Sequence, residues 1–387
     1  MIYNSNFSID NCKRIPIETS VLYEPNDFCD WLYCHHPYII SFKGKLYAMW
    51  SNGRFHEDFP RQRAMMAVSQ DGIKWSSPQV LLEAPHGEFV PCTLLPTGFF
   101  INNDTLYAYI GCTERHIDAL ISVAHMKEYY ENTGYDHEYF DQFLFPQNQF
   151  THTKIIVLST KDGQNWRKEK SIELNMLGNM PPIKLLNGAL ILAGHGIKAA
   201  ISQDNGENWR RYGLFNELDI DQYTDAFDNT MDVCKRNGLL TALYENVVVE
   251  LNNKLFMLFR SNERVLYVSE SADFGLTWSS PQKTAFTNDN ARFQIFSLND
   301  GRYAYVGNPL LDSGRCPLVL SISKDGIEYN KHFIIQDQLF SKKFQGIAKG
   351  GIAAYPYAVQ KDHYIYIIYS VQKERIMVTR VRIEDVC

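Results

Sequence analysis

A short pattern occurs five times along the chain and constrains its fold more than any other feature. Each copy opens with Ser or Thr, has Asp two residues later and a Gly soon after, and ends in an aromatic residue. The copies are Ser69–Trp75, Thr160–Trp166, Ser202–Trp209, Ser271–Trp278 and Ser323–Tyr329. Such residues form a tight β-turn, because the Ser and Asp oxygens accept hydrogen bonds from backbone amides and Gly adopts a positive φ. We therefore expect these aspartates to be structural rather than catalytic.

The spacing of the turns predicts the architecture. Successive turn aspartates lie 91, 42, 69 and 52 residues apart, which fits one four-stranded propeller blade for each turn, with insertions in the longer gaps. A further pair of strand-like segments follows the last turn, ending at Ile376–Val381. We predict an all-β, six-bladed β-propeller with four antiparallel strands per blade, seven blades being the alternative. Residues 14–23 are expected to supply the closing strand of the last blade.

The domain organisation follows from the same pattern. No segment resembles a linker, so residues 1–387 are predicted to form a single propeller domain. Residues 116–150 interrupt the regular spacing and are rich in aromatic side chains. We interpret them as an insertion in blade two, which is either a lid over the axial face or a docked surface loop.

Composition and charge exclude several classes of function. The chain has 38 Lys and Arg against 44 Asp and Glu, a net charge of −6, and no basic run that would attract nucleic acid. No apolar segment is long enough to span a membrane. The N-terminal residues do not resemble a secretory signal, and the eight cysteines are scattered. We expect a cytoplasmic protein, or a secreted or periplasmic one if a signal was removed, that is a monomer and needs no metal or cofactor.

The five turns are similar to the Asp-box, or bacterial neuraminidase repeat, and the chain resembles the sialidase superfamily of β-propellers over nearly its whole length. Tyr244–Leu251, followed by a strand ending in Arg260, resembles the sialidase segment that supplies a carboxylate and a clamp arginine. This resemblance implies that Glu245 is the carboxylate and Arg260 an arginine that holds the substrate. Tyr355 stands where sialidases place their nucleophilic tyrosine, and Arg315 matches a second clamp arginine more loosely.

Elementary chemistry agrees with this set. A tyrosine hydroxyl, with a pKa near 10, becomes a nucleophile only when a neighbouring carboxylate takes its proton. Two arginines beside it would hold a substrate carboxylate by charge-assisted hydrogen bonds. Arg292 is a further candidate for contact with the substrate.

Blade one departs from the sialidase pattern. His35 stands where the first clamp arginine is expected, and a neutral imidazole does not replace a guanidinium. Ionisable residues follow Arg54 in the segment where sialidases keep their acid/base aspartate, so Glu57 or Asp58 is a candidate for that role. Alternatively, His36 and His56, expected to be adjacent across the blade, form the proton-transfer pair. Arg63 in this region and His195 further along the chain are candidates for substrate contacts.

The sequence therefore predicts an enzyme that binds an oligosaccharide or polysaccharide in the axial pocket and cleaves a glycosidic bond of an acidic sugar. The first alternative is a polysaccharide lyase that acts on uronate-containing glycans by β-elimination, because paired histidines with Arg and Tyr resemble the β-propeller lyases and a rhamnosidase-type hydrolase family. The second alternative is a non-catalytic propeller that binds glycans or proteins. Convergence of the axial candidates in one place would favour an enzyme.

Overall fold

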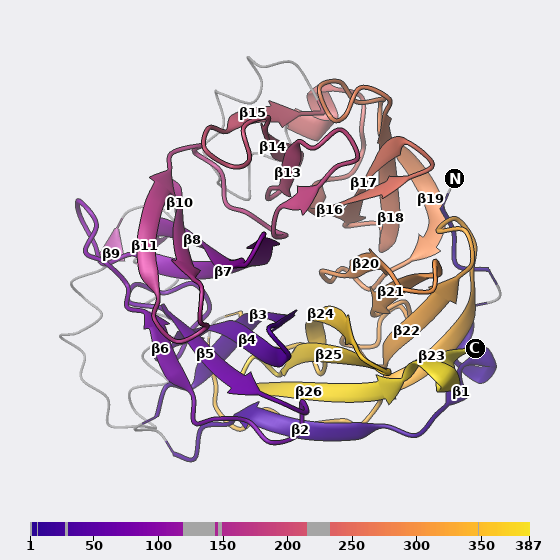
Figure 1. Ribbon diagram of the computed structural model, residues 1–387, viewed down its shortest axis with the longest axis horizontal. Coiled ribbons are helices and arrows are strands. Elements are labelled where there is room, and N and C mark those ends of the chain that lie inside the picture. Colours follow the sequence, from indigo (N-terminus) through magenta and orange to yellow (C-terminus); the bar gives the residue numbers. More distant parts are fainter. Residues whose placement is uncertain are drawn as a thin grey trace.

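The computed structural model describes residues 2–5, 7–27, 30–118, 144–145, 149–214, 233–346 and 348–387. The strands in these ranges form six sheets arranged in a ring, seen end-on in Figure 1. Each sheet contains a four-stranded antiparallel blade, so the predicted six-bladed propeller is confirmed. None of the described helices is long and apolar enough to cross a membrane.

The blades follow one another around the ring in chain order. Blades 1 to 3 comprise β3 (Tyr33–Phe42), β4 (Lys45–Gly53), β5 (Arg63–Ser69) and β6 (Gln79–Leu82); β7 (Thr93–Asn102), β8 (Thr105–Asp118), β10 (Gln149–Thr160) and β11 (Arg167–Ile172); and β12 (Ile183–Lys184), β13 (Leu190–Ala193), β14 (Lys198–Ser202) and β15 (Arg210–Gly213). Blades 4 and 5 comprise β16 (Leu243–Leu251), β17 (Lys254–Ser261), β18 (Val265–Ser271) and β19 (Gln282–Thr287); and β20 (Gln294–Ser297), β21 (Tyr303–Gly307), β22 (Leu318–Ser323) and β23 (Tyr329–Gln336).

Blade 6 joins the two ends of the chain. It contains β24 (Ala354–Lys361), β25 (Tyr364–Val371), β26 (Arg375–Arg382) and, as its outer strand, β2 (Glu18–Tyr23). The strand β2 runs antiparallel to β26, with Thr19 opposite Thr379. The expected closure by an N-terminal strand is thus confirmed. Four short elements lie outside this scheme: β1 (Lys13–Arg14) pairs with β23, β9 (Leu144–Phe145) pairs with β8, and two 3-10 helices cover Ile9–Asn11 and Ile383–Val386.

The repeated turns connect the third and fourth strands of blades 1 to 5 and have the predicted structure. In the first, a carboxylate oxygen of Asp71 accepts the backbone N–H groups of Ile73 at 2.9 Å and Lys74 at 2.8 Å. Gly72 has a φ of +74°, and the indole N–H of Trp75 donates to its carbonyl at 3.1 Å. In blade 6 the corresponding junction falls between β26 and β2, where the two chain ends meet, so a ring of six blades carries five turns.

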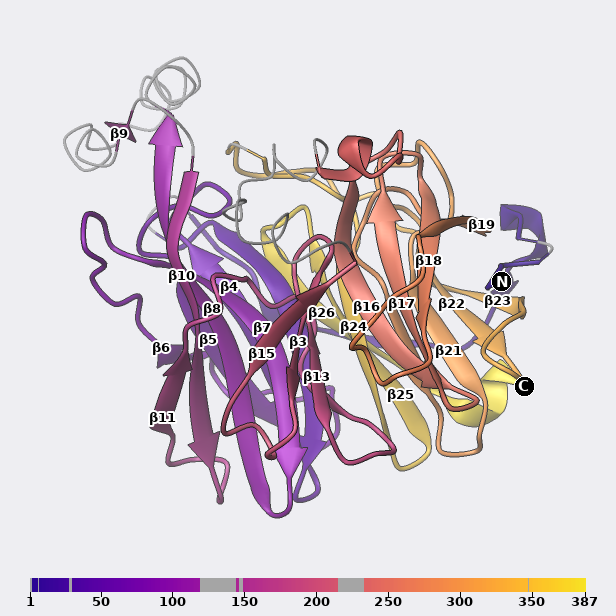
Figure 2. The same ribbon diagram turned by 90° about the horizontal axis from the view of Figure 1, so that it is seen from above.

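Apolar residues of neighbouring sheets fill the space between the blades, since nearly every residue of β13, β14 and β22 is buried. The apolar residues form several clusters between neighbouring sheets. Most of the insertion predicted at 116–150 lies outside the described residues. Figure 2 shows that β8 and β10, which flank it in the sequence, extend beyond the neighbouring strands.

Candidate functional site

Three of the innermost strands break their pairing register near their first residues. The breaks lie between His35 and Tyr38 in β3, between Tyr244 and Asn246 in β16, and between Ala354 and Tyr357 in β24. Each break contains a non-glycine residue with positive φ, namely His36 (50°), Glu245 (21°) and Tyr355 (54°). Such bulges re-aim a side chain and cost free energy, and they are frequent beside functional sites. The three strained residues are candidates that the sequence singles out.

Glu245, Arg260 and Tyr355 form one hydrogen-bonded group across blades 4 and 6. Arg260 lies opposite Tyr244 in the β16–β17 pair, one position before the bulge. Its Nη1 donates to the Glu245 carboxylate and, at 3.0 Å, to the Tyr355 hydroxyl. The Tyr355 hydroxyl also hydrogen-bonds to Glu245. A phenol therefore lies between a proton acceptor and a cation.

The charges of this group are strongly perturbed. Burial raises the pKa of Glu245, but Arg260, then His195, the hydrogen bond from Tyr355 and Arg292 outweigh it and lower this pKa to about 2. Burial, then the Glu245 charge, raises the pKa of Tyr355 well above its ordinary value. Glu245 is therefore a carboxylate and Tyr355 a neutral phenol in the resting protein. This division of charge is typical of a nucleophile and base before reaction.

Arg315 approaches the same tyrosine from blade 5. Its guanidinium carbon lies 5.4 Å from the centre of the Tyr355 ring. Its Nη2 donates to the backbone carbonyl of Asn290 at 3.2 Å, and the Asn290 side chain accepts from Nε of Arg260 at 2.5 Å. The two predicted clamp arginines thus lie on either side of one asparagine.

Arg292 lies beside Tyr355 and is only 1% exposed. It donates to the Tyr38 hydroxyl at 2.7 Å, and its guanidinium carbon lies 4.7 Å from the ring centres of both Tyr38 and Tyr355. Tyr38 in turn donates to the carbonyl of Asn179 at 2.6 Å. These contacts support the Tyr355 ring, and contact of Arg292 with a substrate stays a prediction.

His35 and His36 are both buried beside Tyr355. The ring centres lie 4.1 Å (His35) and 5.6 Å (His36) from the Tyr355 ring. Nδ1 of His35 is 2.7 Å from the Ser370 hydroxyl, and Nδ1 of His36 is 3.1 Å from the Ser51 hydroxyl. Burial lowers the pKa of both rings, and nearby cations lower it further, so both imidazoles are neutral. His35 is fully buried, and its contact with a substrate stays a prediction.

Glu57 and Asp58 lie in the β4–β5 connection, next to this group. Glu57 pairs with the Lys373 ammonium, and its Oε1 lies 3.5 Å from the Tyr33 hydroxyl and 3.9 Å from Nε2 of His35. Arg115 and Lys373 act on the charge of the Asp58 carboxylate, and its Oδ1 is buried without a hydrogen-bond partner among the described residues. Burial, followed by the Glu57 charge, raises the pKa of Asp58 to about 7. Of the two candidates, Asp58 therefore has the properties of a proton donor.

The expected adjacency of His36 and His56 is wrong. In the β3–β4 pair Ser51 lies opposite His35, so His56 falls beyond the end of β4, where its ring packs at 4.5 Å from that of Phe59. The turn after Gly53 carries the chain away from the strand, and a separation of about twenty residues in sequence does not reveal this.

Arg63 and His195 lie at the edge of the cluster or outside it. Arg63 stacks at 3.7 Å on the Trp31 ring and donates to the Asn52 side chain. It is therefore held by blade 1 itself. The His195 ring lies 6.5 Å from that of Tyr244, and its charge contributes to the lowered pKa values of Glu245 and His36. His195 thus lies close to Glu245 and His36 but outside the hydrogen-bonded group of Glu245, Arg260 and Tyr355.

Sequence reasoning missed two residues of the site. Asn290, with a φ of 42°, precedes β20, and Lys373 lies in the β25–β26 turn. Asn290 occupies the same place before an inner strand as several other candidates, a signal that was available. Nothing in the sequence around Lys373 distinguishes it from a solvent-exposed turn lysine.

One set of described residues has the spacing of metal ligands, since donor atoms of His35, His36 and Glu57 lie within 4.8 Å of one another. The electrostatics oppose a cation there. Lys373 already neutralises Glu57, and Arg292 and Arg315 add positive charge beside His35. We therefore assign no metal to the cluster.

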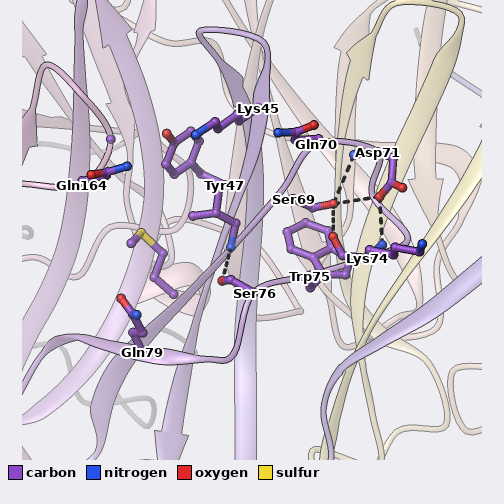
Figure 3. A pocket seen from close by; sticks show the side chains of 13 residues that line it. Lys45, Tyr47, Ser69, Gln70, Asp71, Lys74, Trp75, Ser76, Gln79 and Gln164 are labelled. Atoms are coloured by element: carbon purple, nitrogen blue, oxygen red, sulfur yellow. Dashed lines mark hydrogen bonds between the residues drawn. The ribbon is translucent and has the colours of Figure 1, made fainter.

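A separate crevice of about 720 Å³ lies between blades 1 and 2 (Figure 3). It is lined by Lys45, Tyr47, Asp71, Trp75 and Gln164, among others. These residues lie at the Asp-box end of the strands, opposite the end that carries His36 and Tyr355. The crevice is therefore distinct from the axial cluster.

Comparison with known proteins places the chain in a family. The model of the BNR repeat-like domain matches residues 44–367. No curated protein sequence matches the chain significantly.

Solved structures share the fold at low sequence identity. A protein of unknown function from Dyadobacter fermentans is 14% identical, with a TM-score of 0.64, over 97% of this chain and 100% of that one. The NanB sialidase of Streptococcus pneumoniae is 13% identical, with a TM-score of 0.64, over 95% and 71% of the two chains. The Trypanosoma rangeli sialidase, solved with the inhibitor DANA, is 12% identical, with a TM-score of 0.59, over 90% and 55%. The chain therefore belongs to the BNR repeat-like domain family, and it shares its propeller fold with these solved sialidases.

Proposed function

We propose that this protein is a glycoside hydrolase that cleaves the glycosidic bond of an acidic sugar at the axial cluster. The observation that carries the proposal is the hydrogen-bonded group of Tyr355, Glu245 and Arg260, with the Arg260 Nη1 at 3.0 Å from the Tyr355 hydroxyl. Four of the five predicted axial residues, His36, Arg260, Arg315 and Tyr355, converge there. This convergence favours an enzyme over a non-catalytic binding propeller.

Each residue has a distinct part in the reaction. Arg260 and Arg315 hold the sugar carboxylate by charge-assisted hydrogen bonds. The Tyr355 oxygen attacks the anomeric carbon while its proton passes to Glu245, and Asp58 donates a proton to the leaving oxygen as the glycosidic bond breaks. Water then attacks the glycosyl–tyrosine bond, with Asp58 accepting the proton of water and Tyr355 recovering its own from Glu245. The balance is one bond hydrolysed by one water molecule.

Charge explains why a tyrosine suits this role. A phenol hydrogen-bonded to a carboxylate attacks as a nearly neutral nucleophile, so it does not repel the negatively charged carboxylate of the substrate. Arg260 stabilises the oxygen as its proton leaves. The raised pKa of Tyr355 keeps it neutral until the substrate binds.

A second candidate function is elimination from a uronate. The observation that favours it is the pair of neutral, buried histidines beside arginines, because an unprotonated imidazole can remove the C5 proton of a uronate whose carboxylate is neutralised. This reaction would yield an unsaturated uronide that absorbs in the near ultraviolet, whereas hydrolysis gives no such product.

The test is to incubate the wild-type protein with sialylated and uronate-containing glycans and to measure both new reducing ends and ultraviolet absorbance. We expect reducing ends without absorbance, and we expect Tyr355→Phe to lose at least about 10²-fold in kcat. Tyr355→Phe also removes a hydrogen bond, so its melting temperature is measured beside that of Tyr357→Phe, a variant of the half-buried tyrosine two residues further along β24. Absorbance would identify the lyase, and no product from any glycan would contradict both enzymes.

A further inference from the structure

Both proposed clamp arginines hydrogen-bond to Asn290. Its side-chain oxygen accepts from Nε of Arg260 at 2.5 Å, and its main-chain carbonyl accepts from Nη2 of Arg315 at 3.2 Å. Arg260 comes from β17 in blade 4, and Arg315 from the connection between β21 and β22 in blade 5. Asn290 lies in the β19–β20 connection between those blades, so a single residue joins guanidinium groups that the chain supplies from different sheets.

The segment around Asn290 is itself anchored. The backbone N–H of Asp289 donates to the carbonyl of Asn308 at 2.7 Å, and the Asn288 side chain donates to the carbonyl of Ala291 at 2.7 Å. Asp289 also accepts the backbone N–H of Arg315 at 3.2 Å. Asn290 has a φ of 42°, a left-handed conformation that asparagine tolerates better than most residues. The two acceptor oxygens are therefore held in fixed positions before any ligand arrives.

The hydrogen bonds to Asn290 leave one amino group of each guanidinium for a ligand. Arg260 uses Nε for Asn290 and Nη1 for Glu245 and Tyr355, and its Nη2 has no hydrogen bond to a described residue. Nη1 of Arg315 is buried and has no partner among the described residues. One donor of each guanidinium therefore remains that a carboxylate would satisfy.

We infer that Asn290 is the positioning residue of the clamp, which orients Arg260 and Arg315 so that a free amino group of each meets the carboxylate of an acidic sugar. Asn290 acts through the arginines and not on the substrate. The inference rests on the proposed function for the identity of the ligand, but the contacts that carry it do not depend on catalysis.

Asn290→Gly tests this role, because glycine adopts the left-handed backbone without strain and removes only the side-chain acceptor. The matched control is Asn252→Gly, since Asn252 has a φ of 51° in the exposed β16–β17 turn and does not contact the arginines. With a 4-methylumbelliferyl sialoside or glucuronide, whichever is cleaved, we expect Asn290→Gly to raise KM about tenfold. It should also lower kcat, by a smaller factor, because the displaced Arg260 also stabilises the Tyr355 oxygen. Asn252→Gly should change neither, and both variants should melt near the wild-type temperature.

Direct binding separates this inference from the proposed function. Isothermal titration with free N-acetylneuraminic acid and glucuronic acid should show wild-type affinity for Asn252→Gly and about tenfold weaker affinity for Asn290→Gly. If the wild type binds an acid but cleaves nothing, the hydrolase is wrong and the positioning role stands.

The crystal structure of Asn290→Gly tests whether the side chain of Asn290 positions the arginines. We expect the Arg260 guanidinium to rotate away from its wild-type position. If the variant binds and turns over like the wild type, or if both guanidinium groups are unmoved, the inference is overturned. If the wild type binds neither acid, the proposed function fails and only the displacement of the guanidinium groups decides the role of Asn290.

Discussion

At the scale of single residues, the axial cluster depends on backbone conformations that most side chains avoid. His36, Glu245 and Tyr355 each have a positive φ within a bulge of an inner strand. Such a conformation costs about 1–3 kcal/mol per residue and persists only where the surrounding structure enforces it. Here the three side chains are held by contacts with Ser51, Arg260 and one another. The strain is therefore offset by the same contacts that assemble the site.

Asp58 carries the pH dependence that we expect. Burial raises the pKa of Asp58 to about 7, so the carboxyl stays protonated, and able to donate, up to about that pH. We expect kcat/KM for a substrate with a sugar leaving group to fall as the pH rises through about 7. Asp58→Asn should lower kcat by about 10²–10⁴-fold and remove this limb of the pH profile. For an aryl glycoside, whose leaving group needs little protonation, Asp58→Asn should lower kcat much less.

The raised pKa of Asp58 also makes the stability of the fold depend on pH. Its pKa is higher in the folded protein than in the unfolded chain, so its contribution is complete below about pH 4 and is lost as the pH rises through about 7. Asp58→Asn should therefore melt closer to the wild type at pH 5 and gain relative to it at pH 8. Asp104→Asn, at an exposed turn, is the control that should show no such crossover. A pH profile unchanged by Asp58→Asn would assign the proton donor elsewhere.

At the scale of elements, the Asp-box turns lie at one end of the blades and stabilise the fold, whereas the inner-strand bulges lie at the other end and carry the candidate site. In the first turn, the hydrogen bonds from Lys74 and Ile73 lower the pKa of Asp71, although burial acts in the opposite sense. The turns are local structures that close the third and fourth strands. They lie at the end of the blade opposite Tyr355, which explains how five regular aspartates serve the fold without taking part in the site.

We expect Asp71→Ala to lower the free energy of unfolding by about 1–2 kcal/mol, because two backbone N–H groups lose their acceptor. A lowered pKa stabilises the folded state above about pH 4, and this contribution is lost as the pH falls through the folded-state pKa. The difference between variant and wild type should therefore shrink in acid. Urea unfolding at several pH values measures it.

Asp104→Ala again provides the matched control, since Asp104 lies in the β7–β8 turn with only a Lys43 contact at 3.9 Å. Its unfolding free energy should stay within about 0.5 kcal/mol of the wild type. A loss in Asp71→Ala that persists unchanged at low pH would mean that the carboxylate hydrogen bonds are not the cause.

At the scale of the whole molecule, the ring is closed by pairing between the two ends of the chain. Thr19 and Thr379 lie opposite each other in β2 and β26, with hydroxyl oxygens 2.8 Å apart, and the Tyr369 hydroxyl lies 3.0 Å from Thr379. Because β2 is the outer strand of blade 6, its separation would expose the edge of β26 and break the pairing between the two ends of the chain.

A covalent link at this junction should stabilise the propeller. The double variant Thr19→Cys with Thr379→Cys joins facing residues, and its oxidised form should be more stable than its reduced form by about 2–4 kcal/mol. The melting temperature measured with and without reductant gives this difference within one protein. The wild type under both conditions shows any effect of its own cysteines. An oxidised form that melts no higher than the reduced one would show that the junction does not limit unfolding.

The sequence by itself determined the repeating unit, because each Asp-box turn is a local structure whose Ser, Asp and Gly residues specify it within a few positions. It favoured six blades over seven and an N-terminal closing strand. The resemblance to sialidase segments pointed to Glu245, Arg260, Arg315 and Tyr355. Only the tertiary structure decided that His35 and Arg292 are buried behind Tyr355, that His56 packs against Phe59, and that Asn290 joins two arginines. These relations depend on how blades pack around the axis, and residues from different blades meet there without any fixed spacing along the chain.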